Sequence, residues 1–450
     1  MIHDERVSYL NEQPEQKGKY VIYWMQASQR IKYNHALETA VRIANKRKLP
    51  LLVYFELIDH YPEANLRHYT FMLEGIKEVE KQLKEMGILM IINYTAAQKY
   101  PDLVQLSQQA AMVITDCGYL RFQIEWREAY AEKLPCLFLQ VESDIIVPVE
   151  TASEKEEFTA GTFRPKVHRL MQDYLQPLKM SLPTETSLDM SFASFPVADL
   201  KICLEHLSID NSVSPPSLYH GGSSQAEKIL LQFIEEKIYR FNSLRNDPAQ
   251  DYQSQMSPYL HFGQISPLYI ALKVKQEAPA EAYRVYLEEL IVRREVAINF
   301  VYYNENYDQF SGLPRWARTS LVAHQMDPRK YVYSLAELEH GLTHDIYWNA
   351  AQKEMVKTGK MHGYMRMYWG KKILEWSPTP QEAFQSCLYL NNKYELDGRD
   401  PNSYTGVAWC FGKHDRAWKE RLIFGKIRYM NANGLRRKFD MEKYIEKVNQ

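Results

Sequence analysis

The sequence predicts an α/β N-terminal domain with a parallel, Rossmann-like sheet, followed by an all-α C-terminal domain. In residues 20–150, short continuous apolar runs alternate with amphipathic stretches, as in βαβ units whose strands are buried on both faces. From about residue 226 onward the periodicity is helical and no strong strand signal intervenes. Residues 151–225 lack periodicity and are rich in Ser, Thr, Glu and Pro. We therefore expect domains at 1–150 and 226–450, joined by a long connector over the surface.

The N-terminal elements follow from the apolar runs. Strands are expected at 20–24, 51–55, 88–92, 112–115 and 136–141, and helices at about 34–47, 66–86 and 97–110. No GxGxxG motif follows the first strand, so the usual dinucleotide fingerprint is absent. Ligands of open α/β sheets bind beyond the carboxyl ends of the strands, so any pocket of this domain should involve loops 25–30 and 115–118. Ordinary turn chemistry and contact with a cofactor explain these loops equally well.

The helical pattern of the C-terminal domain can be divided into separate elements. Helices are expected at about 225–234, 283–303, 334–341, 344–357, 364–376 and 380–392. A further helix should begin at Ser257-Pro258, because hydroxylated residues and proline are common at helix starts.

The composition indicates a soluble intracellular protein. Hydrophobic residues make up 45% of the 450 residues and charged residues 25%, and the net charge is −1. The five scattered cysteines form no CxxC pair, which indicates reduced thiols and no cysteine metal site. No signal peptide and no membrane-spanning apolar run is present. We expect a monomer without a bound metal, in the cytoplasm or, in a eukaryote, the nucleus.

Residues 360–376 contain two tryptophans, Trp369 and Trp376, and a single arginine, Arg366. Trp369 and Trp376 are seven residues apart, so both rings project from the same face of a helix, and Trp348 lies just upstream. Such a pattern is commonly a Met/aromatic core stripe. The alternative is a row of oxidisable indoles that passes electrons between a buried redox centre and the surface.

The motifs around this segment resemble those of the class II cyclobutane pyrimidine dimer DNA photolyases. They are the runs at 257–264, 358–363, 390–409, 414–421 and 425–430, and the similarity spans nearly the whole chain. The resemblance implies light-driven repair of UV-damaged DNA that contains pyrimidine dimers, by electron transfer from reduced, anionic FAD held in the helical domain. It also implies a possible second, antenna chromophore in the N-terminal domain, which is a deazaflavin, a folate or a flavin in different relatives.

The resemblance assigns residues to FAD. The segment that matches the FAD diphosphate site contains Gln253, Ser254, Gln255, Met256 and Ser257. The flavin ring is flanked by Arg366 and Asp397, and Asn391 faces flavin N5. The loop closing over the cofactor contains Asp397, Gly398, Arg399 and Asn402. Without the family, the first segment is a capped helix start, and Arg366 and Asp397 could form a buried ion pair with no redox role.

Further residues match the relay and the lesion pocket of the family. The resemblance implies electron transfer through Trp369, Trp348 and Trp376, in that order from flavin to surface. Glu289, Met367 and Trp409 match the catalytic pocket that receives a flipped dimer, and Asn246 is a weaker candidate. Arg293 occupies a position where some relatives carry a second tryptophan, so lesion stacking should rely more on Trp409. An alternative role for Glu289 is an i,i+4 ion pair with Arg293.

Residues 411–440 form a basic region. Nine cations face three acids there, and aromatic rings are interleaved, a combination suited to phosphates and unpaired bases. Arg416, Trp418 and Arg428 match DNA-binding residues that fill the gap left by the flipped dimer. A solvated basic helix end is the simpler alternative. For the whole chain, the alternatives are a signalling cryptochrome on the same scaffold and a flavin-free nucleic-acid-binding protein.

Overall fold

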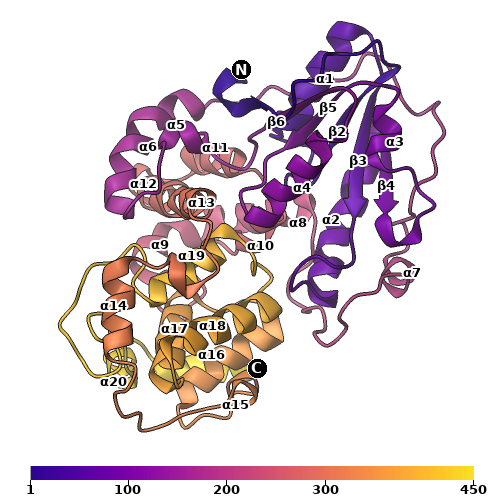
Figure 1. The fold of residues 1–450 in the computed structure, drawn as a ribbon. Helices are drawn as coiled ribbons and strands as arrows, with labels where there is room; N and C mark the ends of the chain where they lie inside the picture. Colours follow the sequence, from indigo (N-terminus) through magenta and orange to yellow (C-terminus); the bar gives the residue numbers. More distant parts are fainter. Residues whose placement is uncertain (1) are drawn as a thin grey trace.

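The computed structural model describes residues 2–450, which form a sheet domain and a helical part lying against each other (Figure 1). The sheet has six strands in the order β1-β6-β5-β2-β3-β4. They are β1 (Val7–Tyr9), β2 (Tyr20–Trp24), β3 (Leu51–Leu57), β4 (Leu89–Tyr94), β5 (Ala110–Asp116) and β6 (Leu137–Val141). Neighbouring strands from β6 to β4 pair in parallel, whereas the edge strand β1 pairs antiparallel with β6. The predicted α/β fold class is confirmed. The sequence does not predict the short strand β1, because three residues are too few to show a periodicity.

Helices cover both faces of this sheet (Figure 1). They are α1 (His35–Arg47), α2 (Leu66–Glu85), α3 (Leu103–Ser107) and α4 (Arg121–Ala131). Val21 and Tyr23 of β2 pack on one side while Ile22 and Trp24 pack on the other, which explains why the strand is apolar throughout. The helix predicted at about 97–110 is wrong in extent. Pro101 disfavours a helical residue before it, and the chain enters β5 soon after the short α3.

Residues 151–225, the predicted connector, contain more regular structure than their composition predicts. Helix α5 (Val149–Ala152) extends into them, and α6 (Ala160–Tyr174) and α7 (Leu200–Glu205) lie within them. Proline at position 165 lies inside α6, where it obscures the helical pattern. Farther along, the chain follows the edge strand β4, and the Phe195 amide donates to the Ile92 carbonyl at 2.8 Å.

Residues 226–450, all of which the structure describes, are helical apart from loops and one bridge between Arg421 and Gly425. The helices, the first of which begins at residue 223, are α8 (Ser223–Gln232), α9 (Ile238–Leu244), α10 (Ser257–His261), α11 (Pro267–Glu277), α12 (Ala280–Leu287), α13 (Arg294–Tyr303), α14 (Arg315–Ala323), α15 (Leu335–Glu339), α16 (Ile346–Thr358), α17 (Gly363–Trp376), α18 (Pro380–Tyr394), α19 (Pro401–Cys410), α20 (Ala432–Arg436) and α21 (Met441–Asn449). A π-helical turn, Glu288–Arg293, joins α12 to α13, and such turns often occur at functional sites. Within the described residues, no helix is long and apolar enough to cross a bilayer.

The start of α2 holds the two parts of the molecule together. Asn65, its N-cap, donates through Nδ2 to the Lys393 carbonyl at 2.8 Å. Arg67 is 3% exposed and donates to the carbonyls of Val356 and Tyr394, both at 2.6 Å. The sheet domain therefore supports the C-terminal ends of α16 and α18, and through them the loop that leads into α19.

Candidate functional site

A cavity of about 470 Å³ lies among the helices of the C-terminal part. The segment before α10, the first turns of α17 and the loop between α18 and α19 form its wall, together with the π-helical turn. From the predicted set, the lining residues are Asn246, Gln253, Ser254, Gln255, Met256, Ser257, Glu289, Arg366, Met367, Asp397 and Asn402. The fold therefore brings together residues that are up to about 150 positions apart in the sequence.

A cluster of buried charges forms one side of this cavity. Arg366 Nη2 lies 3.1 Å from Asp397 Oδ1 and 2.9 Å from Glu395 Oε2. Lys360 Nζ donates to the Ser257 hydroxyl. Burial opposes ionisation of Asp397, but the charges of Arg366 and Lys360 overcome this effect and hold its pKa well below the usual range. Burial raises the pKa of Glu395 to about 8, against the opposing charge of Arg366.

Two of the four charged residues in this cluster, Lys360 and Glu395, are not among the predicted site residues. Both belong to the motifs that carry the family resemblance, and Glu395 precedes Asp397 by two positions. Glu395 is fully buried and accepts a hydrogen bond from the Met361 amide at 3.0 Å, so the loop geometry brings it to Arg366. The signal in the sequence that could have pointed to Glu395 was the cluster of charged residues between 393 and 400.

Asn391 lies next to the cavity but does not line it. Its side chain is fully buried on α18, and Nδ2 donates to the Ser403 hydroxyl and to Asn392 Oδ1. Its Oδ1 has no hydrogen-bond partner among the described residues. The Asn392 Oδ1 to which Asn391 donates also accepts from the Arg399 amide at 3.0 Å, which fixes the nitrogen of Asn391 on that side and leaves its oxygen as the atom without a partner.

Gly398 and Arg399 also lie outside the wall of the main cavity. The backbone of Arg399 is left-handed, with φ of 65°, and its guanidinium donates to the Asn392 carbonyl at 2.7 Å. A side chain at Gly398 would meet the Asn392 Cα at 2.9 Å, which requires glycine there. The turn therefore directs Arg399 toward a second cavity, between the two parts of the molecule.

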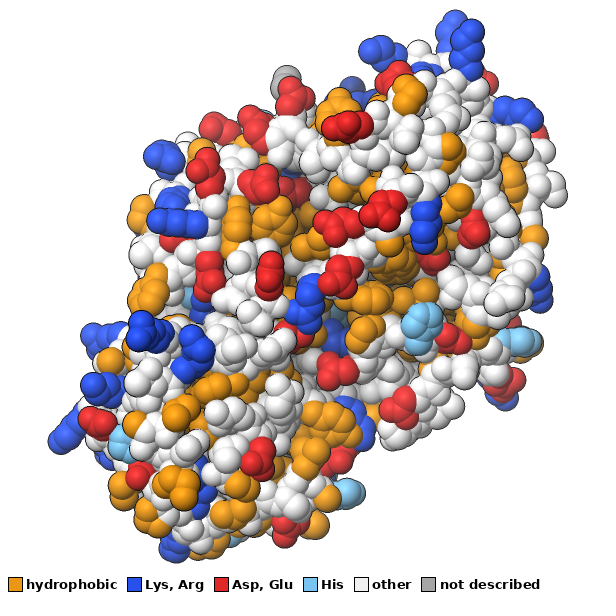
Figure 2. All heavy atoms as spheres, viewed as in Figure 1, with side chains coloured by type: hydrophobic (Ala, Val, Ile, Leu, Met, Phe, Trp, Pro, Cys, Tyr) orange, Lys and Arg blue, Asp and Glu red, His pale blue; other side chains and the backbone are white. Residues whose placement is uncertain are grey.

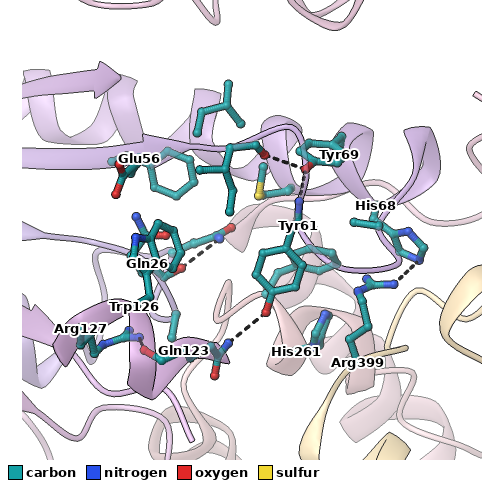
Figure 3. A pocket seen from close by; sticks show the side chains of 18 residues that line it. Gln26, Glu56, Tyr61, His68, Tyr69, Gln123, Trp126, Arg127, His261 and Arg399 are labelled. Atoms are coloured by element: carbon teal, nitrogen blue, oxygen red, sulfur yellow. Dashed lines mark hydrogen bonds between the residues drawn. The ribbon is translucent and has the colours of Figure 1, made fainter. Parts of the chain in front are cut away.

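This second cavity has a volume of about 100 Å³ (Figure 3). The 25–30 loop contributes Gln26, Ala27 and Gln29, as expected for the carboxyl edge of the sheet. The Gln123 amide donates to the Tyr61 hydroxyl at 3.3 Å across the cavity. Arg399 Nη1 and His68 Nε2, which lie 3.1 Å apart, belong to the two different parts of the molecule (Figure 3).

The three predicted relay tryptophans form a continuous row. The ring centroids of Trp369 and Trp348 are 6.3 Å apart with an interplanar angle of 5°, and those of Trp348 and Trp376 are 5.6 Å apart. Trp348 Nε1 donates to the Trp369 carbonyl at 3.0 Å, and Trp369 Nε1 to Gln352 Oε1 at 2.9 Å. All three rings are buried, and Trp376 also contacts the rings of Tyr333 and His344, each at 5.3 Å.

The π-helical turn places two of the predicted substrate residues. Glu289 Oε1 lies 3.1 Å from Arg245 Nη1, and its side chain is 42% exposed at the cavity. Arg293 pairs instead with Glu288, at 3.2 Å. The i,i+4 pair between Glu289 and Arg293 is therefore not what orients this carboxylate.

The predicted DNA-binding residues form a second row, of alternating rings and cations. The guanidinium of Arg428 lies 5.6 Å from the ring centroid of Trp409 and 5.3 Å from that of Trp418. Arg416 lies 5.2 Å from the Trp418 ring, which is 39% exposed. Figure 2 shows Lys and Arg side chains gathered along the edge of the helical part where α14 and the loop between α19 and α20 lie.

Comparisons with known proteins agree on one family. Residues 21–184 match the DNA photolyase family. The deoxyribodipyrimidine photo-lyase of Methanothermobacter thermautotrophicus is 51% identical over 100% of this chain and 99% of its own length. That of Potorous tridactylus is 40% identical over 97% of this chain and 82% of its own length, and that of Arabidopsis thaliana 39% identical over 95% and 88%.

Solved structures with low sequence identity share the fold. A class III photolyase from Agrobacterium tumefaciens superposes with a TM-score of 0.73 at 16% identity, covering 96% of this chain and 87% of its own. An archaeal photolyase from Sulfolobus tokodaii, crystallised with two FAD molecules, gives a TM-score of 0.70 at 18% identity, covering 95% and 89%.

Proposed function

Because the chain belongs to the DNA photolyase family, we propose that it splits cyclobutane pyrimidine dimers in DNA by light-driven electron transfer from reduced, anionic FAD. The proposal rests chiefly on the 470 Å³ cavity, which gathers most of the residues that the family resemblance assigns to FAD, and Glu289 and Met367 of those assigned to the dimer. We further propose that the enzyme is of class II, on the strength of the motifs at 390–409 and 414–421.

The residues of the main cavity fit FAD. Arg366 Nε is buried without a hydrogen-bond partner among the described residues, so a donor is available to an acceptor atom of the ring. The hydroxyl groups and amides of 253–257, with Lys360 beside Ser257, would hold the diphosphate. Bound FAD supplies the photochemistry, and the protein supplies position, charge and exclusion of water.

The charge cluster suits an anionic ligand. Arg366 and Lys360 bring two positive charges to the cavity, and Asp397 stays ionised beside them. Glu395 is the carboxyl with the raised pKa, so it is the group of this cluster that takes up a proton most readily, and Asp397 then remains the anionic partner of Arg366. We propose that Arg366 lies beside the ring and that Asn391 presents its amide toward N5.

We propose that electrons reach FAD through Trp369, Trp348 and Trp376. Centroid distances of 6.3 and 5.6 Å between neighbouring rings support a direct electron transfer from one indole to the next. The burial of all three rings shields an indole that has lost an electron from side reactions with solvent.

On the substrate side, we propose that the dimer is flipped out of the duplex into the main cavity. Met367 lines this cavity and would form part of the wall of the pocket. Trp409 does not line it and would flank the dimer from α19, and Glu289 would accept or donate a hydrogen bond at the pyrimidine edge. The row formed by Arg428, Trp418 and Arg416 continues from Trp409 to the surface, which suits the opened strands on either side of the lesion.

We propose a second, antenna chromophore in the cavity between the two parts. Gln29 Oε1 is buried there without a partner among the described residues, so an acceptor is available to a ligand donor. At about 100 Å³ this cavity is smaller than a typical ligand site of roughly 300 Å³ or more, so only part of the flat ring of a deazaflavin, folate or flavin would enter it, beside Tyr61 and Trp126.

The test is photoreduction of purified holoenzyme. The wild-type protein should be yellow, and Trp369→Phe should retain FAD but lose most photoreduction of oxidised flavin. Trp316→Phe, which removes an indole of α14 outside the row, is the matched control and should photoreduce normally. Chemically reduced Trp369→Phe should still repair a dimer-containing oligonucleotide. A colourless protein, or unchanged photoreduction in Trp369→Phe, would contradict the proposal.

A further inference from the structure

Lys371, on α17, is fully buried beneath the predicted lesion platform. Its ammonium donates to the Cys410 carbonyl at 2.6 Å and lies 5.0 Å from the ring centroid of Trp409. No carboxylate forms an ion pair with it among the described residues. A buried ammonium held by one carbonyl and one ring is costly, and a methionine would fill the same space without that cost. Packing alone therefore does not explain a lysine here.

The charge of this side chain persists at neutral pH. Burial lowers the pKa of Lys371 to about 8, so most molecules carry the ammonium at pH 7. A second cation, the guanidinium of Arg428, lies 5.6 Å from the same ring. Trp409 thus faces two positive charges, one of them buried.

The relay tryptophans are in a different electrostatic environment. Within the described residues, no Lys or Arg lies over the ring of Trp369 or Trp348. Lys372 approaches the Trp376 ring at 5.6 Å, but it is paired with Glu375 at 2.6 Å, which compensates its charge. The cations at Trp409, in contrast, form no ion pair within the described residues, and the charge of Asp415 acts on Lys371 only from beyond ion-pair distance.

The proposed function places Trp409 in the lesion pocket, beside the cavity that would hold FAD, where it would compete with the relay. Helices α17 and α19 pack so tightly that a Cβ on Gly370 would meet the Cys410 sulfur at 2.7 Å. Trp409 precedes that cysteine on α19, and Met367, one turn before Lys371 on α17, lines the cavity. An indole in this position could reduce the same light-excited flavin as Trp369, and it would then be an oxidised ring in the lesion pocket.

We propose that Lys371 is a positioning residue for the electron path: its ammonium, together with Arg428, keeps Trp409 from donating an electron, so that electrons enter only through Trp369. Removing an electron from an indole creates a positive charge, which a cation 5 Å away opposes. In the permitted path the Trp369 ring is oxidised as the flavin is reduced, and a soluble thiol restores the electron through Trp348 and Trp376. This inference rests on the proposed function.

The test is a gain of photoreduction in a protein whose relay is blocked. Trp369→Phe should reduce the rate of flavin photoreduction with dithiothreitol as the donor. Adding Lys371→Met should raise that rate about tenfold or more, because the neutral side chain no longer opposes oxidation of Trp409. Adding Lys371→Arg, which keeps the charge, should not. A further Trp409→Phe should abolish the gain.

Two additional measurements separate this role from a structural one. Lys371→Gln keeps a donor for the Cys410 carbonyl without the charge, so it should show the same gain and covers the case in which the methionine variant folds poorly. In the dark, Lys371→Met should bind a dimer-containing oligonucleotide within about threefold of the parent, because stacking on Trp409 remains. Weakened binding without any gain of photoreduction would mean that Lys371 only supports the ring, and the inference would be overturned.

Failure of the proposed function gives different results. A purified protein without FAD would contradict the cofactor assignment. A Trp369→Phe variant that photoreduces as fast as the parent would contradict the relay. Either result also removes the inference, whereas a blocked relay with no gain in Trp369→Phe/Lys371→Met and Trp369→Phe/Lys371→Gln removes the inference alone.

Discussion

Replacing Arg67 by methionine should destabilise the protein strongly, because this residue joins the two parts of the molecule. Its guanidinium donates to the carbonyls of Met355 at 3.2 Å, Val356 at 2.6 Å and Tyr394 at 2.6 Å, and through Nε to the Ser214 carbonyl at 3.0 Å. The carbonyls of Met355, Val356 and Tyr394 lie in the last turns of α16 and α18, where the helix dipole is negative. The Met355 carbonyl also accepts from the Gly359 amide at 2.9 Å. Methionine keeps the packing of the stem and removes all donors.

The expected loss follows from these four carbonyls, of which that of Met355 keeps the Gly359 amide as a donor. A buried acceptor that loses its donor costs about 1–3 kcal/mol, so Arg67→Met should lower the free energy of unfolding by roughly 3–6 kcal/mol, allowing for water that enters the site. Burial lowers the pKa of Arg67 to about 10, so it is charged at neutral pH and the lost hydrogen bonds are the charge-assisted kind. Since α18 leads directly to Glu395 and Asp397, the variant should also release FAD more readily.

Urea unfolding at neutral pH, followed by circular dichroism and flavin fluorescence, measures both effects. Arg121→Met is the matched control. Arg121 also extends from the sheet domain to the helical part, but its side chain is 40% exposed where it pairs with Asp308. Loss of such an exposed pair should cost about 1 kcal/mol or less. Arg67→Lys, which keeps the charge but not the guanidinium geometry that reaches four carbonyls, should fall between them. Equal losses in the two methionine variants would refute this account of the junction.

Other predictions test the relay, the charge cluster and the DNA-binding row. Trp376→Phe should impair photoreduction but leave reduction by dithionite unchanged, and equal photoreduction would exclude Trp376 from the path. Glu395 has a usual pKa of 4.5 and a native pKa of about 8, so the native state binds this proton more tightly and the stability it confers is lost as pH rises through that window. Glu395→Gln should therefore flatten the fall in unfolding free energy between pH 5 and 8, and an unchanged slope would contradict the raised pKa. Arg428→Ala should weaken binding of damaged and undamaged DNA and reduce its salt dependence, whereas Arg416→Ala should weaken binding of duplex lesions more than single-stranded ones. Titrations at two salt concentrations distinguish these effects. Identical behaviour of the two variants would mean that both residues only bind phosphates.

Local patterns in the sequence determined most of the fold. Continuous apolar runs identified the five strands from β2 to β6 because a strand buried on both faces must be apolar throughout. The spacing of Trp369 and Trp376 likewise indicated a shared helix face, since helical periodicity is a local property. Where local signals were weak or interrupted, as at β1 and at the proline in α6, prediction failed.

Only the tertiary structure decided which distant groups meet. Glu395 and Lys360 join Arg366 because three separate segments converge on one cavity, which no periodicity reveals. The left-handed turn at Arg399 directs its side chain to the other cavity, although it is only two residues from Asp397. The ammonium of Lys371 reaches Trp409 because α17 and α19 are in close contact. Residue type and spacing determine which side of an element is buried, whereas the neighbour of each buried charge depends on how the elements pack.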